Sequence, residues 1–134
     1  MSVIVTDAGF GPDDWTLPIS ALEDARAGYG IDLASSFDPA ELAGRLPEIA
    51  LIRVDFPSSA DGRGFSIARQ LRLMGYTGRL RARGHVLADQ YAMARRCGFD
   101  EVEIDDALAA RQPEDQWMFR ADWRAHDYQA RLRG

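Results

Sequence analysis

The chain has 134 residues and a net charge of −5, with 16 arginines, 21 acidic residues, one cysteine and two histidines. This length suits a single domain over residues 1–134, and Cys97 alone excludes an internal disulfide, as His85 and His126 exclude a histidine-built metal site. Because the sequence has neither a bilayer-length apolar run nor a secretion signal at its start, we expect a cytoplasmic protein without membrane contact.

The first elements are a short strand over 2–7 and a Gly/Pro/Asp-rich loop over 8–15, both of which look peripheral. A regular pattern then begins, with a short helix over 21–28, a strand over 30–35, a helix over 38–46 and a strand over 48–56. Asp38 caps the second of these helices, and Pro39 occupies its first turn.

The second half continues the alternation, with helices over 64–75, 86–96 and 105–112 and strands over 79–83 and 100–104. Four βα units in succession predict an α/β fold with a mostly parallel sheet and right-handed crossovers. The sheet is either flavodoxin-like or half of a (β/α) barrel, and periodicity does not choose between them.

Two strands carry charge on one face. In "RLRAR" (79–83) Arg79, Arg81 and Arg83 share a phase, and in "EVEI" (101–104) Glu101 and Glu103 do the same. One face of the sheet is therefore expected to be polar, either as cross-strand ion pairs or as the inner face of an incomplete barrel that is wet or closed by a partner.

The C-terminal segment 113–134 is expected to form a helical tail with four aromatic residues, Trp117, Phe119, Trp123 and Tyr128. Large aromatics near a chain end favour packing or self-association over ligand binding, so a homo-oligomer is expected.

Charge is strongly segregated along the chain. Residues 63–96 hold 8 arginines and one acid, whereas residues 1–62 hold 11 acids and 3 arginines. The chain has no lysine, so every cation is a guanidinium, which holds carboxylate, sulfate or phosphate through paired hydrogen bonds. Arg69 and Arg72 lie on the polar phase of helix 64–75, as on a solvated face, and the flanking regions are acidic. We therefore expect no nucleic-acid binding.

The carboxyl ends of two strands carry the candidate binding residues. Asp55 stands near the end of strand 48–56, and Asp61, Gly62, Arg63, Gly64 and Ser66 follow this strand. Gly84, Asp89 and Gln90 follow strand 79–83, whose Arg81 is added as a second guanidinium. Ligands of α/β sheets bind at this edge, where a helix start and the Arg63 fork would hold an anion. Alternatively, the glycines serve a tight turn and Arg63 pairs with Asp55 or Asp61.

Catalytic chemistry has fewer candidates. His85 and Asp89 are the candidate proton carriers, although an acid beside arginines stays ionised and a turn histidine is often simply exposed. Ser66 is not in a Gly-x-Ser-x-Gly elbow, "DGRGFSIA" departs from the dinucleotide fingerprint at Ile67, and Cys97 fits a buried structural thiol.

Three blocks, "DFPSSADGRGFSIARQLR", "GYTGRLRARGHVLADQ" and "RRCGFDEVEI", resemble a small bacterial domain-of-unknown-function family, number 934. Its members are labelled as oxidoreductases involved in sulfite reduction because they are encoded beside sulfite reductase. The resemblance covers residues 30–104 and extends to Asp55, Phe56, Asp61, Gly62, Arg63, Gly64, Phe65, Ser66, Arg81, Gly84, Asp89, Gln90, Gly98 and Phe99. The chain departs from the family at His85, where an aspartate is usual.

The resemblance implies an accessory role in assimilatory sulfate and sulfite reduction, with sulfite reductase as a partner. No flavin, haem or iron–sulfur ligand set is recognisable, so no cofactor is expected. Three hypotheses follow: a protein that binds an oxyanion or a phosphorylated or sulfated small molecule, an interaction module that docks onto another copy or a reductase, and a small acid–base enzyme.

Overall fold

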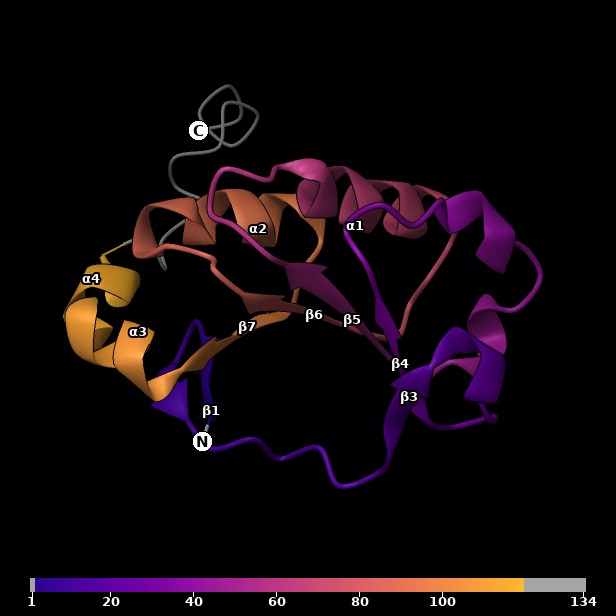
Figure 1. The fold of residues 1–134 in the computed structure, drawn as a ribbon, viewed down its shortest axis with the longest axis horizontal. Helices are drawn as coiled ribbons and strands as arrows, with labels where there is room; N and C mark the ends of the chain where they lie inside the picture. Colours follow the sequence, from indigo (N-terminus) through magenta and orange to yellow (C-terminus); the bar gives the residue numbers. More distant parts are fainter. Residues whose placement is uncertain (1, 120–134) are drawn as a thin grey trace, which may run out of the picture.

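A computed structural model describes residues 2–119 of the chain. Seven strands form one sheet: β1 (Ser2–Thr6), β2 (Gly9–Gly11), β3 (Ile19–Ala21), β4 (Gly30–Leu33), β5 (Leu51–Phe56), β6 (Arg79–Gly84) and β7 (Glu101–Asp105). The α-helices are α1 (Arg63–Leu73), α2 (Tyr91–Cys97), α3 (Asp106–Arg111) and α4 (Glu114–Met118). Figure 1 shows these elements around a curved sheet.

The sheet has the strand order β2-β1-β7-β6-β5-β4-β3. Strands β3 to β7 are parallel and adjacent in chain order, whereas β1 pairs antiparallel with both β2 and β7. Helices α1 and α2 lie on the same face of this sheet (Figure 1). The predicted α/β class with a mostly parallel sheet is confirmed, and the consecutive strand order is that of a half-barrel rather than of a doubly wound sheet.

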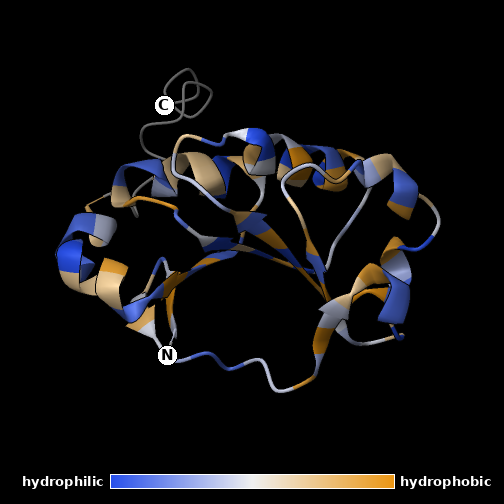
Figure 2. Cartoon of the chain, in the orientation of Figure 1, coloured by the Kyte–Doolittle hydropathy of each residue, from blue (hydrophilic) through white to orange (hydrophobic). Residues whose placement is uncertain are grey.

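The hydrophobic core lies between the sheet and helices α1 and α2. From α1 it receives Phe65, Ile67, Ala68 and Leu71, which recur at helical spacing, and from α2 it receives Tyr91 and Ala94. Hydrophobic and hydrophilic residues alternate along the central strands (Figure 2) because only one phase of each strand faces the helices. Within residues 2–119, no helix is long and apolar enough to cross a membrane.

Two predicted helices are wrong in type. Residues 21–28 contain only the end of β3 and the 3₁₀ helix η1 (Leu22–Asp24), and residues 38–46 contain η2 (Pro39–Leu42) and the start of η3 (Leu46–Glu48). Gly44 has a φ of +83°, which stops a continuous helix between η2 and η3. The Asp38 cap is confirmed, since its carboxylate accepts from the Ala40 amide at 3.0 Å.

The N-terminal strand β1 lies inside the sheet, not at its periphery as the sequence suggested. Ile4 and Val5 are 3% and 0% exposed, and β1 separates β2 from β7. A five-residue strand at the start of a chain gives no sign of its neighbours, because its pairing partner β7 lies about a hundred residues later.

Between β7 and residue 119 the chain forms α3 and α4, and α4 lies at the start of the tail that was predicted to be helical over 113–134. Trp117 is fully buried and packs edge-on against Tyr91 at 6.1 Å between ring centroids, while Phe119 is 74% exposed. Trp123 and Tyr128 lie outside the described residues.

Residues 12–18, here called the strap, connect the two edge strands β2 and β3. Seven strands laid flat would span about 29 Å between the edges, whereas the eight Cα steps from Gly11 to Ile19 reach at most about 26–29 Å. A flat sheet would therefore leave this connection no slack, whereas here it runs across the concave face of a curved sheet (Figure 1).

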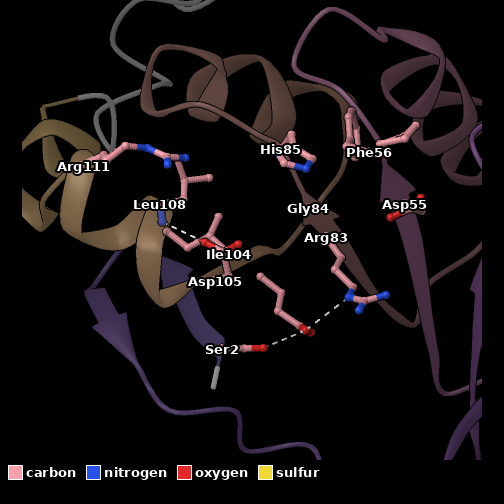
Figure 3. A pocket seen from close by; sticks show the side chains of 12 residues that line it. Ser2, Asp55, Phe56, Arg83, Gly84, His85, Ile104, Asp105, Leu108 and Arg111 are labelled. Atoms are coloured by element: carbon pink, nitrogen blue, oxygen red, sulfur yellow. Dashed lines mark hydrogen bonds and ion pairs between the residues drawn. The ribbon is translucent and has the colours of Figure 1, made fainter.

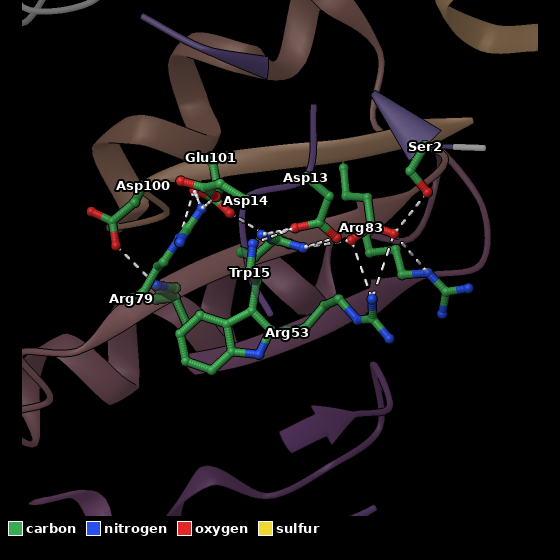
Figure 4. Close-up of polar contacts among 12 residues, drawn as sticks. Ser2, Asp13, Asp14, Trp15, Arg53, Arg79, Arg83, Asp100 and Glu101 are labelled. Atoms are coloured by element: carbon green, nitrogen blue, oxygen red, sulfur yellow. Dashed lines mark hydrogen bonds and ion pairs between the residues drawn. The ribbon is translucent and has the colours of Figure 1, made fainter. Parts of the chain in front are cut away.

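Figure 4 shows the charged layer on this concave face, where the strap meets the strands. Arg81 is 0% exposed and donates to Glu101, to Glu103 at 2.9 Å and to Asp13 of the strap at 3.0 Å. Asp14 pairs with Arg79, whose guanidinium also lies 6.0 Å from the centre of the Trp15 ring. The polar face predicted from β6 and β7 is thus a layer of cross-strand ion pairs covered in part by the chain's own strap.

Candidate functional site

A pocket of about 280 Å³ lies at the carboxyl edge of β5, β6 and β7, and is here called the edge pocket (Figure 3). Its lining residues come from these strand ends, from β1 and from α3: Ser2, Asp55, Phe56, Pro57, Arg83, Gly84, His85, Glu103, Ile104, Asp105, Leu108 and Arg111. Its position is the one at which parallel α/β sheets bind ligands.

Three basic side chains reach the edge pocket from different elements. Arg83 stands near the end of β6 and is about half exposed, with its Nε 3.6 Å from Glu103. His85 follows β6 directly, where its backbone amide donates to the Phe56 carbonyl at 2.9 Å. Arg111, in the last turn of α3, extends toward the side of the pocket where His85 lies (Figure 3). His85 and Arg111 both line the pocket, and within residues 2–119 their side chains have no hydrogen bond or ion pair.

Three carboxylates also line the edge pocket, and two of them are engaged. Glu103 accepts from Ser2 and from the guanidinium groups of the concave face, and Asp105 caps α3 by accepting from the Leu108 amide at 2.7 Å. Asp55 is half-buried and has no hydrogen bond or ion pair with the described part of the chain. The pocket therefore offers one unengaged carboxylate beside its basic groups.

The residues that the sequence predicted around Arg63 lie outside the edge pocket, on the other side of the loop that follows β5. Arg63 holds both Asp61 oxygens, at 2.9 and 2.7 Å, and donates to Ser35 at 3.0 Å. The hydrogen bonds from the Arg63 side chain and backbone amide hold the pKa of the Asp61 carboxyl well below its usual value. Asp61 thereby accepts from the first amide of α1 and pairs with the Arg63 guanidinium, which corresponds to the structural alternative for this motif.

A shallow hollow of about 390 Å³ adjoins this pair and is lined in part by Ser35, Arg63 and Ser66. Ser66 is exposed on α1. The fold therefore divides the predicted site in two. Asp61, Arg63 and Ser66 lie on one side of the loop, and Asp55, Gly84 and His85 lie at the edge pocket.

The glycines of the motif have packing roles. A Cβ on Gly64 would lie 2.4 Å from the Phe56 ring, and a Cβ on Gly84, whose φ is +117°, would lie 2.6 Å from the Phe56 carbonyl oxygen. Gly62 ends the loop before α1 with open space around it. Gly64 and Gly84 let α1 and β6 approach Phe56, which contacts Phe65 and Phe99.

Gln90 and Asp89 are placed apart from the edge pocket. Gln90 accepts from the Leu87 amide and donates to the Ser59 carbonyl at 2.8 Å, so it ties the loop after β6 to the loop after β5. Asp89 is exposed and lines a different pocket with Asp115, Gln116 and Phe119. The two candidate proton carriers, His85 and Asp89, thus line separate cavities.

Arg81 does not reach the carboxyl edge, where the sequence placed it. Burial alone would lower the pKa of its guanidinium, but the hydrogen bonds with Asp13, Glu101 and Glu103 and the charge of Glu101 raise it. With its donors on three carboxylates beneath the strap, Arg81 holds the concave face together and is not available to a ligand in the edge pocket.

The prediction that Arg72 lies on a solvated face of α1 is wrong. Its guanidinium donates to the carbonyls of Tyr76, Gly78 and Gly98 and to Asp100, at 2.8–3.0 Å. Arg69 is exposed, with one long contact of 3.9 Å to the sulfur of the buried Cys97. Arg72 therefore joins the end of α1 to the turn before β7.

Sequence reasoning missed Arg83 and Arg111 as candidate ligand-binding residues. Arg83 was interpreted only as part of the charged phase of β6, either in ion pairs or on the inner face of an incomplete barrel, and Arg111 lies beyond the resembling blocks. The position of Arg111 could have indicated its role, because α3 follows β7 at the same carboxyl edge as the loops after β5 and β6. In residues 2–119, no three His, Cys, Asp or Glu side chains are grouped as metal ligands.

Consecutive parallel strands, helices on one face and a charged edge pocket define a small α/β protein of half-barrel type. Residues 30–134 match the family described as bacterial protein of unknown function (DUF934), and the chain belongs to this family. The match includes every lining residue of the edge pocket except Ser2. No curated protein and no solved structure matches the chain significantly.

Proposed function

We propose that the chain binds a small oxyanion, or a small molecule with a phosphate or sulfate group, in the edge pocket. The observation that carries this proposal is that Arg83 and His85, at the end of β6, and Arg111, in α3, line one cavity. Guanidinium groups match the geometry of oxyanions, and a charge-assisted hydrogen bond is about twice as strong as a neutral one.

The size of the edge pocket supports a small ligand. Its volume of about 280 Å³ lies at the lower end of the roughly 300–1,000 Å³ that is common for ligand pockets. Such a volume suits a free anion or a short-chain metabolite better than a dinucleotide. The proposed anion site is therefore the edge pocket and not the predicted site at Arg63, whose charge is neutralised by Asp61.

The metabolic setting is the second part of the proposal. The resemblance to proteins encoded beside sulfite reductase points to assimilatory sulfate and sulfite reduction, with this chain as an accessory protein. Sulfite and sulfate are therefore the first ligands to examine, with phosphate as the comparison.

The test is thermal unfolding of the wild type and of Arg111→Ala with sulfite, sulfate and phosphate at increasing concentration. A ligand at about 100 times its dissociation constant stabilises the folded state by roughly 2.7 kcal/mol, which shifts Tm by several degrees in a chain of this size. We expect one of these anions to raise Tm of the wild type and to have at most a small effect on Arg111→Ala.

Arg96→Ala is the matched control, because Arg96 is an exposed arginine in the last turn of α2, as Arg111 is in α3. It should keep the wild-type response. Equal responses of all three proteins would show that the anions act on the general charge and not in the edge pocket.

A further inference from the structure

The edge pocket carries charges of both signs, and they are separated in space. Arg111 and His85 lie on one side of Gly84, and Asp55 lies on the other (Figure 3). Arg83 is the register partner of Asp55 across β5 and β6, and its side chain extends away from His85 and Arg111 toward Glu103 (Figure 3). A ligand that lies across Gly84 therefore meets basic groups at one end and a carboxylate at the other.

Asp55 is the carboxylate that a ligand can use. Glu103 has both oxygens on Ser2 and on arginines, and Asp105 has one oxygen on the α3 amide, whereas neither oxygen of Asp55 has a hydrogen-bond or ion-pair partner in residues 2–119. Arg83, its cross-strand neighbour, is instead drawn to Glu103. A simple anion would leave this carboxylate unused and would be repelled by it.

We propose that the ligand of the edge pocket is amphoteric: a small oxyanion that also carries a primary ammonium group. This inference rests on the proposed function, because the oxyanion end is the one held by Arg111 and His85, on the far side of Gly84 from Asp55. The ammonium end donates to Asp55. Amino acids and aminoalkyl phosphates or sulfonates have this chemistry, and their short chains suit the pocket volume.

The test compares O-phosphoethanolamine with ethyl phosphate by isothermal titration of the full chain. The two probes share the phosphate group and the two-carbon chain and differ in the amine. A charge-assisted hydrogen bond to Asp55 should make O-phosphoethanolamine bind about tenfold more tightly. Asp55→Asn keeps the shape of the side chain and should abolish this preference, and ethanolamine alone should not bind measurably.

Each outcome bears on one of the two proposals. Equal affinity of the probes for the wild type would overturn the amphoteric ligand and leave the anion site standing, as would a preference that persists in Asp55→Asn. Failure of both probes, together with failure of sulfite, sulfate and phosphate, would overturn the anion site as well. The wild-type comparison stands without the variant, so a folding defect in Asp55→Asn would not spoil the test.

Discussion

Two glycines of one motif are expected to respond differently to the same substitution. A methyl group on Gly64 would enter the Phe56 ring at 2.4–2.9 Å, whereas a methyl group on Gly62 meets nothing within 4 Å. Gly64→Ala should therefore lower the free energy of unfolding by about 1–3 kcal/mol through overpacking. Gly62→Ala should be neutral or stabilising by up to about 1 kcal/mol. Urea unfolding of both variants tests this, and equal costs would mean that Gly64 is not a packing glycine.

Arg81 gives a second contrast at the scale of single residues. Arg81→Met leaves the buried carboxylates of Glu101 and Glu103 without their common partner, so it should destabilise the fold by roughly 3–5 kcal/mol. Arg83→Met, on the same strand but about half exposed, should cost less than about 1 kcal/mol. Equilibrium unfolding in urea measures both, and a small cost for Arg81→Met would show that the ion pairs of the concave face are dispensable.

At the scale of elements, the strap links the edges of the sheet and depends on ionised carboxylates. Partial burial alone would raise the pKa of the Asp13 carboxyl, but hydrogen bonds from Arg81 and the Trp15 amide hold it below its usual value. The hydrogen bond from Arg79 lowers the pKa of the Asp14 carboxyl in the same way. Both groups bind a proton more readily in the unfolded chain, so their contribution is present above about pH 4 and is lost as the pH falls further.

We therefore expect the free energy of unfolding to fall between pH 5 and pH 3, and to fall less steeply in Asp13→Asn. At pH 7 this variant should be less stable than the wild type by up to about 1 kcal/mol, since Asp13 is partly exposed. Asp24→Asn, an exposed acid of η1, should leave stability at pH 7 within about 0.5 kcal/mol of the wild type. An unchanged pH profile in Asp13→Asn would mean that the strap is not held by this ion pair.

Elements with strong periodicity could be predicted from the sequence, and those shaped by distant contacts could not. Helix α1 and strands β5 to β7 agree with their predicted positions to within a few residues, because each has one clear apolar phase. The predicted helix over residues 38–46 is wrong because Gly44, with a φ of +83°, interrupts the segment and leaves only short 3₁₀ turns. The strap was predicted only as a loop, since its crossing of the sheet follows from the pairing of β1 with β7.

At the scale of the whole molecule, the segregated charges are reunited by the fold. The arginine-rich segment 63–96 pairs with Asp7, Asp13 and Asp14 from the N-terminal acidic region, and with Asp100, Glu101 and Glu103 from the C-terminal one. The clustering along the sequence is thus explained by ion pairs between blocks, without a polyanionic partner. Self-association through the aromatic tail stays a prediction, although Trp117 is used in packing within the chain.

The candidate site could be predicted in part. The rule that carboxyl ends of parallel strands meet at one edge correctly brought together Asp55, Gly84 and His85. It could not tell that the loop after β5 separates them from Arg63, that Arg81 points into the concave face, or that Arg111 returns to the edge from α3. These distinctions depend on side-chain directions and on packing between elements.

The most direct test of the account is to map anion binding by amide chemical shifts in a two-dimensional NMR titration with sulfite, sulfate and phosphate. The edge pocket predicts saturable shifts at Gly84, His85, Leu108 and Arg111. Saturable shifts confined to Asp61, Arg63 and Ser66 would contradict it, placing the anion at the loop before α1, and an absence of saturable shifts with all three anions would contradict the anion site itself.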